Sequence, residues 1–493
     1  MTQTTGDPRA AHAPPYRWRW IALSVLLCAE IMDLLDALVT NIAAPAIRRD
    51  IGGSDTLFQW LSAGYTLAMA VGLITGGRLG DLYGRKRMFM LGAAGFTTAS
   101  LLCGLAGSPE MLIAARVLQG LFGAVMLPQG LGLIKEMFPP KEMAAAFGAF
   151  GPVMGLASVG GPVLAGWLVD ADLFGTGWRM IFLINLPIGL LALAGAARFL
   201  PESRSPEASR LDLAGMALVT VASFLLVYPL VQGRELGWPA WAFASMAGSV
   251  AVFGVFAWYE RRVQRAGGDP LVIPSLFRKR AFTGGLMAGL AFFSALIGFS
   301  LVFALYLQLG LGYAPFQAGL ALLPNALGGV LGFIVAGSGL AVRLGRRLIH
   351  IGTAVMATGM AALALTLSMV ETGLTAWHLA PGLAVTGLGM GLAMAPFFDI
   401  VLAGVEPHES GSASGTLTAI QQLGGAFGAA LLGTVFFNSV TGPESFGDAA
   451  TTTVWLAAGM LVASFAIAFT LPLRARPQEE QEDAPEEDAV TVA

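Results

Sequence analysis

Fourteen apolar stretches follow one another along this chain of 493 residues, and each is long enough to cross a lipid bilayer as a helix. A transmembrane helix needs about 20 consecutive, mostly apolar residues. The connections between the stretches are too short to hold an inserted soluble domain. We therefore expect an all-α polytopic membrane protein. The stretches run roughly over residues 20–47, 57–80, 88–106, 110–136, 143–169, 178–200, 213–231, 240–259, 282–309, 315–342, 348–370, 377–404, 412–438 and 451–473.

Composition excludes the main soluble classes of protein. Hydrophobic residues make up 56% of the chain and charged residues only 12%, whereas charged residues make up about 25% of an average soluble domain. The formal net charge is −3, so there is no basic excess that would attract a nucleic acid. Two cysteines and four scattered histidines argue against a disulfide scaffold and against a metal site.

The distribution of Lys and Arg predicts the orientation. Most of the 28 basic residues fall in the two termini and in the alternate connections that share a side with the termini. Loops rich in Lys and Arg face the cytoplasm. We therefore expect a multi-pass protein of the cytoplasmic cell membrane with both termini in the cytoplasm.

An internal echo divides the chain into two halves. A glycine-rich basic stretch, Gly77–Arg87, closes the second span, and a weaker version, Arg343–Arg347, closes the tenth. Two related halves are a common plan for secondary transporters. The expected segments are a disordered cytoplasmic N-terminus (1–16), a six-helix half (17–200), a linker with two extra transmembrane helices (201–281), a second six-helix half (282–473) and an acidic cytoplasmic tail (474–493).

The sequence contains no signature of a nucleotide site. A P-loop ends in Gly-Lys-Ser/Thr, and none of the four lysines follows a glycine. Uphill transport by this chain alone would therefore use an ion gradient, in which one elementary charge is worth about 2.3 kcal/mol per 100 mV. We expect no cofactor, with a proton gradient as the driving force.

Ionisable residues inside the spans are the candidates for proton coupling. Glu30, Asp33 and Asp36 recur at intervals of three in the first span, which places them on one face of a helix. An ionisable group at the centre of a membrane helix costs about 2.5–3.5 kcal/mol. Arg116 lies well inside the fourth span and could hold a carboxylate ionised or form a packing ion pair. We expect at least one of the acids to carry the proton, Asp36 first and Asp33 second, whereas Glu30 could serve a cationic cargo.

Six motifs occur in the order and in the spans of a known transporter family. They are Leu34–Pro45, Gly77–Arg87, Arg116–Gly120, the stretch around Gly161 and Pro162, Trp178–Gly189, and Tyr306–Gln308 with Ala318–Pro324. Through these motifs the chain resembles the fourteen-span drug:proton antiporters of the major facilitator superfamily, the QacA/EmrB type, over about residues 18–473. The resemblance implies the major facilitator fold, in which two six-helix halves are joined here by two extra central helices, giving 14 transmembrane helices.

The resemblance also implies roles for individual residues. The motif that contains Arg116 is linked to proton translocation in relatives. Pairing of Asp81 with Arg85, facing the start of the thirteenth span, would latch the halves at the cytoplasmic side. The latch motif consists of Gly77, Asp81, Gly84, Arg85, Lys86 and Arg87. The antiporter motif, expected to pack between the halves, consists of Gly155, Gly160, Gly161, Pro162 and Gly166.

Spans 1, 4, 9 and 12 form the central cavity in this family. An acidic, apolar and aromatic lining suits an amphipathic or cationic organic molecule. Among the candidates, Asp399 could instead reach the water at the cytoplasmic end. The candidate lining residues are Asn41, Trp60, Tyr65, Gln119, Gln308, Asn325 and Asp399.

We therefore predict a proton-coupled secondary exporter of lipophilic, cationic drug-like molecules that works by alternating access and is not an enzyme. Export of one self-made antibiotic, another secondary metabolite or a siderophore is the alternative within this class. An uptake symporter fits less well, because the fifth span resembles that of antiporters. A membrane-embedded receptor or enzyme is a remote alternative. The expected partners are a small-molecule substrate, protons and lipid, without nucleic acid or nucleotide, and a monomer is compatible with the sequence.

Overall fold

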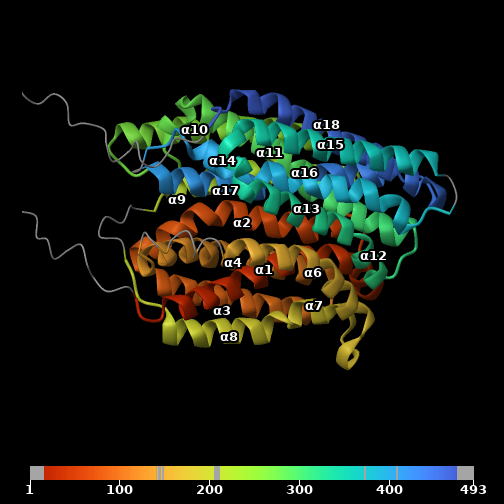
Figure 1. Ribbon diagram of the computed structural model, residues 1–493, viewed down its shortest axis with the longest axis horizontal. Helices are drawn as coiled ribbons and strands as arrows, with labels where there is room; N and C mark the ends of the chain where they lie inside the picture. Colours follow the sequence, from red (N-terminus) through yellow and green to blue (C-terminus); the bar gives the residue numbers. More distant parts are fainter. Residues whose placement is uncertain are drawn as a thin grey trace, which may run out of the picture.

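The computed structural model describes residues 16–139, 142, 146, 149–204, 211–370, 373–406 and 409–474. These residues form helices and turns, and no strand occurs among them. The helices run side by side, and the described chain begins and ends at the same end of the bundle, on the left of Figure 1. We call this the terminal end and the opposite one the distal end. The expected N-terminus 1–16 and acidic tail 474–493 lie almost entirely outside the described residues.

The first half of the bundle is built around close contacts between glycine-bearing helices. Its helices are α1 (Arg19–Ile51), α2 (Thr56–Tyr83), α3 (Arg85–Gly104), α4 (Pro109–Met137), α6 (Phe150–Asp170), α7 (Met180–Leu183) and α8 (Asn185–Phe199). Helix α4 packs against both α2 and α3, and α1 packs against α6 and α8. At Gly76 a Cβ atom would lie 2.0 Å from the carbonyl oxygen of Ala124, so the backbones of α2 and α4 touch there.

The second half repeats this arrangement. It contains α11 (Arg280–Leu305), η5 (Tyr306–Gly310), α12 (Pro315–Ala321), α13 (Leu323–Val335), η6 (Ala336–Leu340), α14 (Ala341–Leu344), α15 (Arg346–Met369), α16 (Ala376–Leu402), α17 (Ser410–Ser439) and α18 (Phe446–Ile467). Helix α16 packs against α13 and α15, and α11 packs against α17 and α18. Glycine again permits the closest approach, since a Cβ at Gly387 would lie 1.8 Å from the carbonyl oxygen of Asn325.

Two further helices cover the line where the halves meet. Helices α9 (Leu213–Gln232) and α10 (Ala240–Arg265) pack on each other, and α9 contacts α2 of the first half and α17 of the second. At the distal end, Gln59 Nε2 donates to the carbonyl oxygen of Ala430 (2.8 Å) and to Thr434 Oγ1 (2.9 Å). Thr434 in turn donates to the carbonyl oxygen of Leu230 at 2.5 Å. One hydrogen-bond chain therefore joins both halves and the extra pair.

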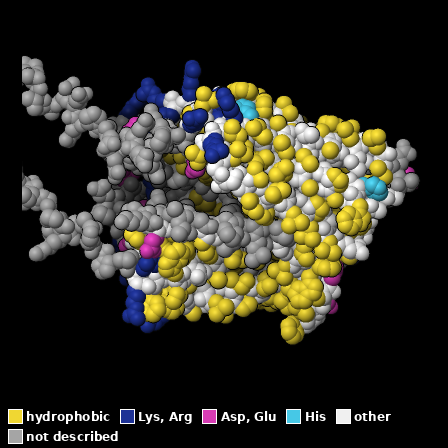
Figure 2. Space-filling view, viewed as in Figure 1, with side chains coloured by type: hydrophobic (Ala, Val, Ile, Leu, Met, Phe, Trp, Pro, Cys, Tyr) yellow, Lys and Arg dark blue, Asp and Glu magenta, His cyan; other side chains and the backbone are white. Residues whose placement is uncertain are grey.

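The flank of the bundle has the character of a lipid-facing surface. Apolar side chains cover it, and Lys and Arg gather at the terminal end (Figure 2). Leu191 is 71% exposed and Val250 is 73% exposed, which is unfavourable over a large area in water and favourable in hydrocarbon. The fold is thus the all-helical membrane architecture that the apolar stretches predict.

The length and hydropathy of the described helices give a count of candidate membrane spans. Ten of the described helices are long and apolar enough to cross a membrane, or up to eleven if the bent α2 is one span. Helices α1, α3 and α6 have 33, 20 and 21 residues but are not among them. In α1 the reason is chemical, because Glu30, Asp33 and Asp36 interrupt its apolar stretch. The expected total of fourteen spans stays a prediction.

Candidate functional site

A buried ion pair lies in the first half of the bundle. Arg116 of α4 donates through Nη1 to Asp36 Oδ2 of α1, and the two side chains are 1% and 0% exposed. Removing one partner of a buried pair costs about 3–5 kcal/mol, because the other charge stays buried without compensation. The pair is therefore a costly feature to place inside a membrane helix bundle, and intramembrane charges of this kind are functional candidates.

Local sequence brings α4 close to α2 and places Arg116 there. Gly120 has no side chain, so α4 can approach α2 until a Cβ at that position would lie 2.4 Å from the carbonyl oxygen of Tyr65. One turn before Gly120, Arg116 lies over the Tyr65 ring, with 4.2 Å between its Cζ and the ring centroid. Its Nε also donates to the carbonyl oxygen of Leu61 at 3.2 Å. The guanidinium is thus held by cation–π and backbone contacts as well as by Asp36.

Two amide side chains complete the surroundings of the Asp36 carboxylate. Gln119 Nε2 donates to Asp36 Oδ1 at 2.8 Å, and Asn185 Nδ2 donates to the same oxygen at 2.9 Å. Both amides also donate to Ser100 Oγ, at 2.8 and 3.3 Å. Gln119 Oε1 accepts from Arg116 at 2.7 Å. Helices α1, α3, α4 and α8 therefore meet at one hydrogen-bonded carboxylate, and we call Asp36, Arg116, Gln119, Asn185 and Ser100 the buried polar cluster.

A second acid lies beside this cluster. Tyr65 OH donates to Asp33 Oδ1, and Asp33 is buried. Because the Tyr65 ring also lies under Arg116, it connects Asp33 to the buried polar cluster. Glu30 is half-buried one turn further toward the terminal end and has no hydrogen-bond partner among the described residues. Solvent exposure thus falls along α1 from the half-buried Glu30 through Asp33 to the fully buried Asp36.

The structure brings together five of the residues expected from the sequence and leaves others apart. Asp33, Tyr65, Arg116, Asp36 and Gln119 are linked by consecutive contacts, from the Asp33–Tyr65 hydrogen bond to the hydrogen bonds of Arg116 and Gln119 with Asp36. The remaining cavity candidates lie outside this set. Asn41 is buried on α1, the Trp60 ring lies 6.0 Å from the Tyr228 ring of α9, and Gln308 donates to the carbonyl oxygen of Ile42 at 2.9 Å. Asn325 has a buried Oδ1 without a partner among the described residues, and Asp399 is exposed on α16. Their role in the cavity stays a prediction.

Sequence reasoning missed Ser100 and the role of Asn185. Asn185 lies within the motif Trp178–Gly189, but no role was expected for it. The available signal was that an amide interrupts an otherwise apolar run between Met180 and Ala197. Ser100 gave no signal, because small hydroxyl residues are common in membrane helices and bond to their own backbone.

The glycine-rich motif at the terminal end of α2 ties α2 and α3 to the end of α8. Asp81 accepts from Arg85 Nη2 at 2.9 Å. Gly84 has φ +106°, and a Cβ there would lie 2.3 Å from Glu202 Oε1, so the turn requires glycine. Lys86 Nζ donates to the carbonyl oxygen of Ala197 at 2.8 Å. Arg87 lies 3.4 Å from Glu202, and at Gly77 a Cβ would meet Pro128 at 3.7 Å.

The expected contact of Asp81 with the start of α17 stays a prediction. The Asp81 carboxylate accepts from Arg85 as expected, and part of the start of α17 lies outside the described side chains. We expect Asp81→Asn to lower the export rate several-fold, because the latch would lose its charge. The measurement is export together with labelling of a cysteine at the terminal end, with Asp81→Glu as the control that keeps the charge. Unchanged export and labelling in Asp81→Asn would contradict the latch.

The fifth expected span closes the distal end between the halves. At Gly166 a Cβ would lie 2.4 Å from Phe316 Cα of α12, and Asp170 accepts from the Phe316 backbone N–H at 2.9 Å. The carbonyl oxygen of Pro162 would lie 2.3 Å from a Cβ at Gly319. Gly161 faces Leu38 of α1, where a Cβ would meet Leu38 Cδ1 at 3.1 Å, whereas Gly155 falls where the surroundings are not described. This face of α6 therefore packs between the halves.

Gly166→Leu should reduce export by at least tenfold. The leucine side chain would be forced into the α12 backbone, so the distal end could not close as it does here. Gly254→Leu on α10 is the control, because Gly254 is exposed and no described atom lies within 4 Å of a Cβ there. Export and thermal stability of the two variants provide the comparison. Equal export by both would mean that close packing of α6 on α12 is not needed.

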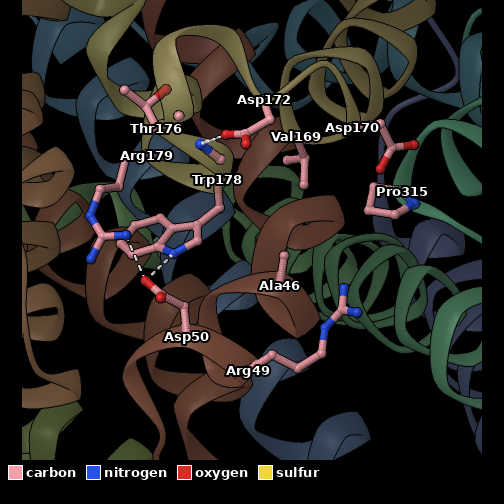
Figure 3. Close-up of a pocket in the computed structure, with 12 residues that line it drawn as sticks. Ala46, Arg49, Asp50, Val169, Asp170, Asp172, Thr176, Trp178, Arg179 and Pro315 are labelled. Atoms are coloured by element: carbon pink, nitrogen blue, oxygen red, sulfur yellow. Dashed lines mark hydrogen bonds and ion pairs between the residues drawn. The ribbon is translucent and has the colours of Figure 1, made fainter.

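A cavity of about 430 Å³ opens at the distal end between α1, the α6–α7 connection and Pro315 (Figure 3). Asp50 accepts there from Trp178 Nε1 at 3.0 Å and from Arg179 Nη1 at 2.5 Å. These hydrogen bonds, the one from Trp178 first, hold the pKa of the Asp50 carboxyl below its ordinary value. The polar groups thus anchor a connection, and the cavity is separate from the buried polar cluster.

Comparison with known proteins identifies a transporter family. The chain matches the family model of the Major Facilitator Superfamily over residues 26–429. It is 56% identical to a probable actinorhodin transporter of Streptomyces coelicolor, over 87% of this chain and 75% of that protein. It is 39% identical to the puromycin resistance protein pur8 of Streptomyces alboniger, over 87% and 84% of the two chains.

More distant similarities extend the same pattern. A tetracenomycin C resistance and export protein of Streptomyces glaucescens is 32% identical over 89% of this chain and 80% of its own. Among solved structures, a proton dependent oligopeptide transporter superposes with a TM-score of 0.65 at 18% identity, over 92% of this chain and 99% of that one. That structural likeness concerns the fold.

Proposed function

Because the chain belongs to the major facilitator superfamily, we propose that it is a proton-coupled exporter that moves an antibiotic or a similar lipophilic molecule out of the cell by alternating access. The names of the relatives support the cargo class, since they refer to transport of actinorhodin, resistance to puromycin, and resistance and export for tetracenomycin C. We further propose that it is of the fourteen-span drug:proton antiporter type.

The buried polar cluster is the observation that carries the proposal of proton coupling. Asp36 is a carboxyl group enclosed at the middle of a long helix, and it accepts hydrogen bonds from Arg116, Gln119 and Asn185. Uptake of a proton would remove the negative charge that holds Arg116, and loss of the proton would restore it. A proton-dependent change in how α1 and α4 attract each other is what coupling requires. Asp33 and Glu30 would supply a path to the cluster.

Alternating access is supported by where the halves touch. The contacts Gln59–Thr434, Gly166–Phe316 and Gln308–Ile42 all lie toward the distal end. Toward the terminal end a hollow is visible between the halves (Figure 2). Lys and Arg gather at this end, which we propose to be cytoplasmic by the positive-inside rule. The described conformation would then be open to the cytoplasm, ready to take up cargo from inside.

Dedicated export of one antibiotic is favoured over broad drug efflux. The 56% identity to a probable actinorhodin transporter is far above the 32–39% identity to the puromycin and tetracenomycin C proteins. Broad efflux of lipophilic cations stays the second candidate, because Glu30, Asp33 and Asp36 of α1 and the exposed Asp399 of α16 are acids that could attract a cationic cargo.

A substrate panel in everted membrane vesicles tests the proposed function. Vesicles carrying the wild-type chain are energised with an inward-acid gradient and given actinorhodin, puromycin, tetracenomycin C and ethidium separately. Uptake of one polycyclic antibiotic well above the others indicates a dedicated exporter, and uptake of all four indicates broad efflux. Vesicles without the protein are the control. No gradient-dependent uptake of any of these would contradict the proposal.

A further inference from the structure

We propose that Asn185 is a positioning residue for the Asp36 carboxylate and thereby sets the pH range over which the transporter exchanges its proton. This inference rests on the proposed function, since it concerns how the same buried acid is tuned. Asn185 is 1% exposed and belongs to α8, whereas the acid is on α1 and its counter-charge is on α4.

The sequence around Asn185 explains why an amide can face inward there. Pro187 has no N–H, so the carbonyl oxygen of Leu183 loses its usual helical partner and the helix is interrupted between α7 and α8. Asn185 is the first residue after this interruption. One turn further along α8, Gly189 allows close packing on α3, where a Cβ would lie 2.0 Å from Thr97 Oγ1. The start of α8 is thus pressed against α3, and Asn185 reaches both Ser100 and Asp36.

The hydrogen bonds around Asp36 suit its charged form. Arg116, Gln119 and Asn185 all donate N–H groups to it. A neutral carboxyl group carries an O–H, and none of these N–H groups can accept a hydrogen bond from it. Loss of one donor would therefore make the neutral acid relatively more favourable. Asn185 is the informative donor to remove, because its amide bonds Asp36 and Ser100, whereas Gln119 bonds both members of the ion pair.

The charged and titratable groups that face Asp36 come from four helices. They are Arg116 on α4, Asp33 on α1, Tyr65 on α2 and Cys103 on α3. Asn185 is neutral, so its replacement by another neutral residue leaves all these charges in place. A change in the pH response of such a variant then reports on the hydrogen bond itself.

The test is the pH profile of actinorhodin exchange in proteoliposomes with equal pH on both sides. Asn185→Leu removes the donor at similar volume. Hydrogen bonds to charged groups are among the stronger ones, and a tenfold change in the ratio of charged to neutral acid corresponds to one pH unit. Since the lost donor stabilised the carboxylate, the neutral acid should persist to higher pH. We expect the midpoint of the profile to rise by about one unit or more.

Controls separate positioning from simple structural damage. Asn185→Gln keeps an amide donor and should shift the midpoint less, and Asn185→Ala serves if the leucine variant is not recovered. Gln129→Leu removes another buried amide of the same half, which donates to the carbonyl oxygen of Gly76 at 2.7 Å, and should leave the midpoint unchanged. A lower rate with an unshifted midpoint in Asn185→Leu and Asn185→Ala would overturn the inference. A wild-type profile without pH dependence would instead count against the proposed function.

Discussion

Asp36→Asn should abolish export driven by a pH gradient, with uptake falling at least 100-fold toward that of empty vesicles. The asparagine keeps the shape of the side chain but cannot bind and release a proton. It also leaves the guanidinium of Arg116, which is 1% exposed, without its counter-charge. Both effects act on the proposed coupling step, in which Asp36 binds and releases a proton and so loses and regains the negative charge that attracts Arg116.

The control for Asp36→Asn is an ion pair outside the buried polar cluster. Asp55→Asn removes a carboxylate that lies 2.5 Å from Arg48 and 2.8 Å from Arg234 at the distal end. Exposed pairs contribute about 0.2–1 kcal/mol, so this variant should keep gradient-driven export. Asp33→Asn and the double variant with Asp36→Asn show which acid carries the proton. Full export by Asp36→Asn, by Asp33→Asn and by the double variant would contradict the assignment of the proton carrier to α1.

Arg116→Leu should also lose export by about 100-fold and should destabilise the protein. Asp36 would then lie in the interior with two amide donors and no counter-charge. The attraction between α1 and α4 that the proposed coupling step switches would be lost. Arg116→Lys keeps the charge but cannot bond Asp36, Gln119 and the Leu61 carbonyl together, so we expect partial loss.

A double-mutant cycle measures the pair directly. Each single change leaves a buried charge without a partner, at about 3–5 kcal/mol, whereas Asp36→Asn with Arg116→Leu removes both charges. The double variant should therefore unfold at a higher temperature than either single variant while remaining inactive. Thermal unfolding of the purified proteins in detergent provides the comparison. Additive losses of stability would mean that the two side chains are not energetically coupled.

The sequence predicted the acids and the arginine of the site but not how they pair. Glu30, Asp33, Asp36 and Arg116 stood out because charge is scarce in the spans and each charge there is costly. Which acid meets Arg116 depends on how α1 and α4 are placed in the bundle, and that placement involves contacts with other helices, such as the close approach of Gly120 to Tyr65 of α2. The pairing was therefore visible only in three dimensions.

Other residues of the site show where pattern reasoning ends. Asn185 interrupts an apolar run, but no sequence pattern says which side chain its amide meets, and Ser100 gives no signal at all. Trp60 packs against the Tyr228 ring of the extra helix α9, a contact that the sequence did not predict, and its expected place in the cavity stays a prediction. The sequence predicted that two extra helices exist between the halves, yet it contains no signal that α9 lies over the α2–α17 contact.

Proton movement driven by cargo tests the central claim most directly. Proteoliposomes with a trapped fluorescent pH indicator are given actinorhodin on one side, without any imposed pH gradient or membrane potential. Wild-type protein should move protons opposite to the flow of the antibiotic, and Asp36→Asn should move neither above the background of empty liposomes. Flow of actinorhodin through the wild-type protein with no change in internal pH would contradict proton antiport.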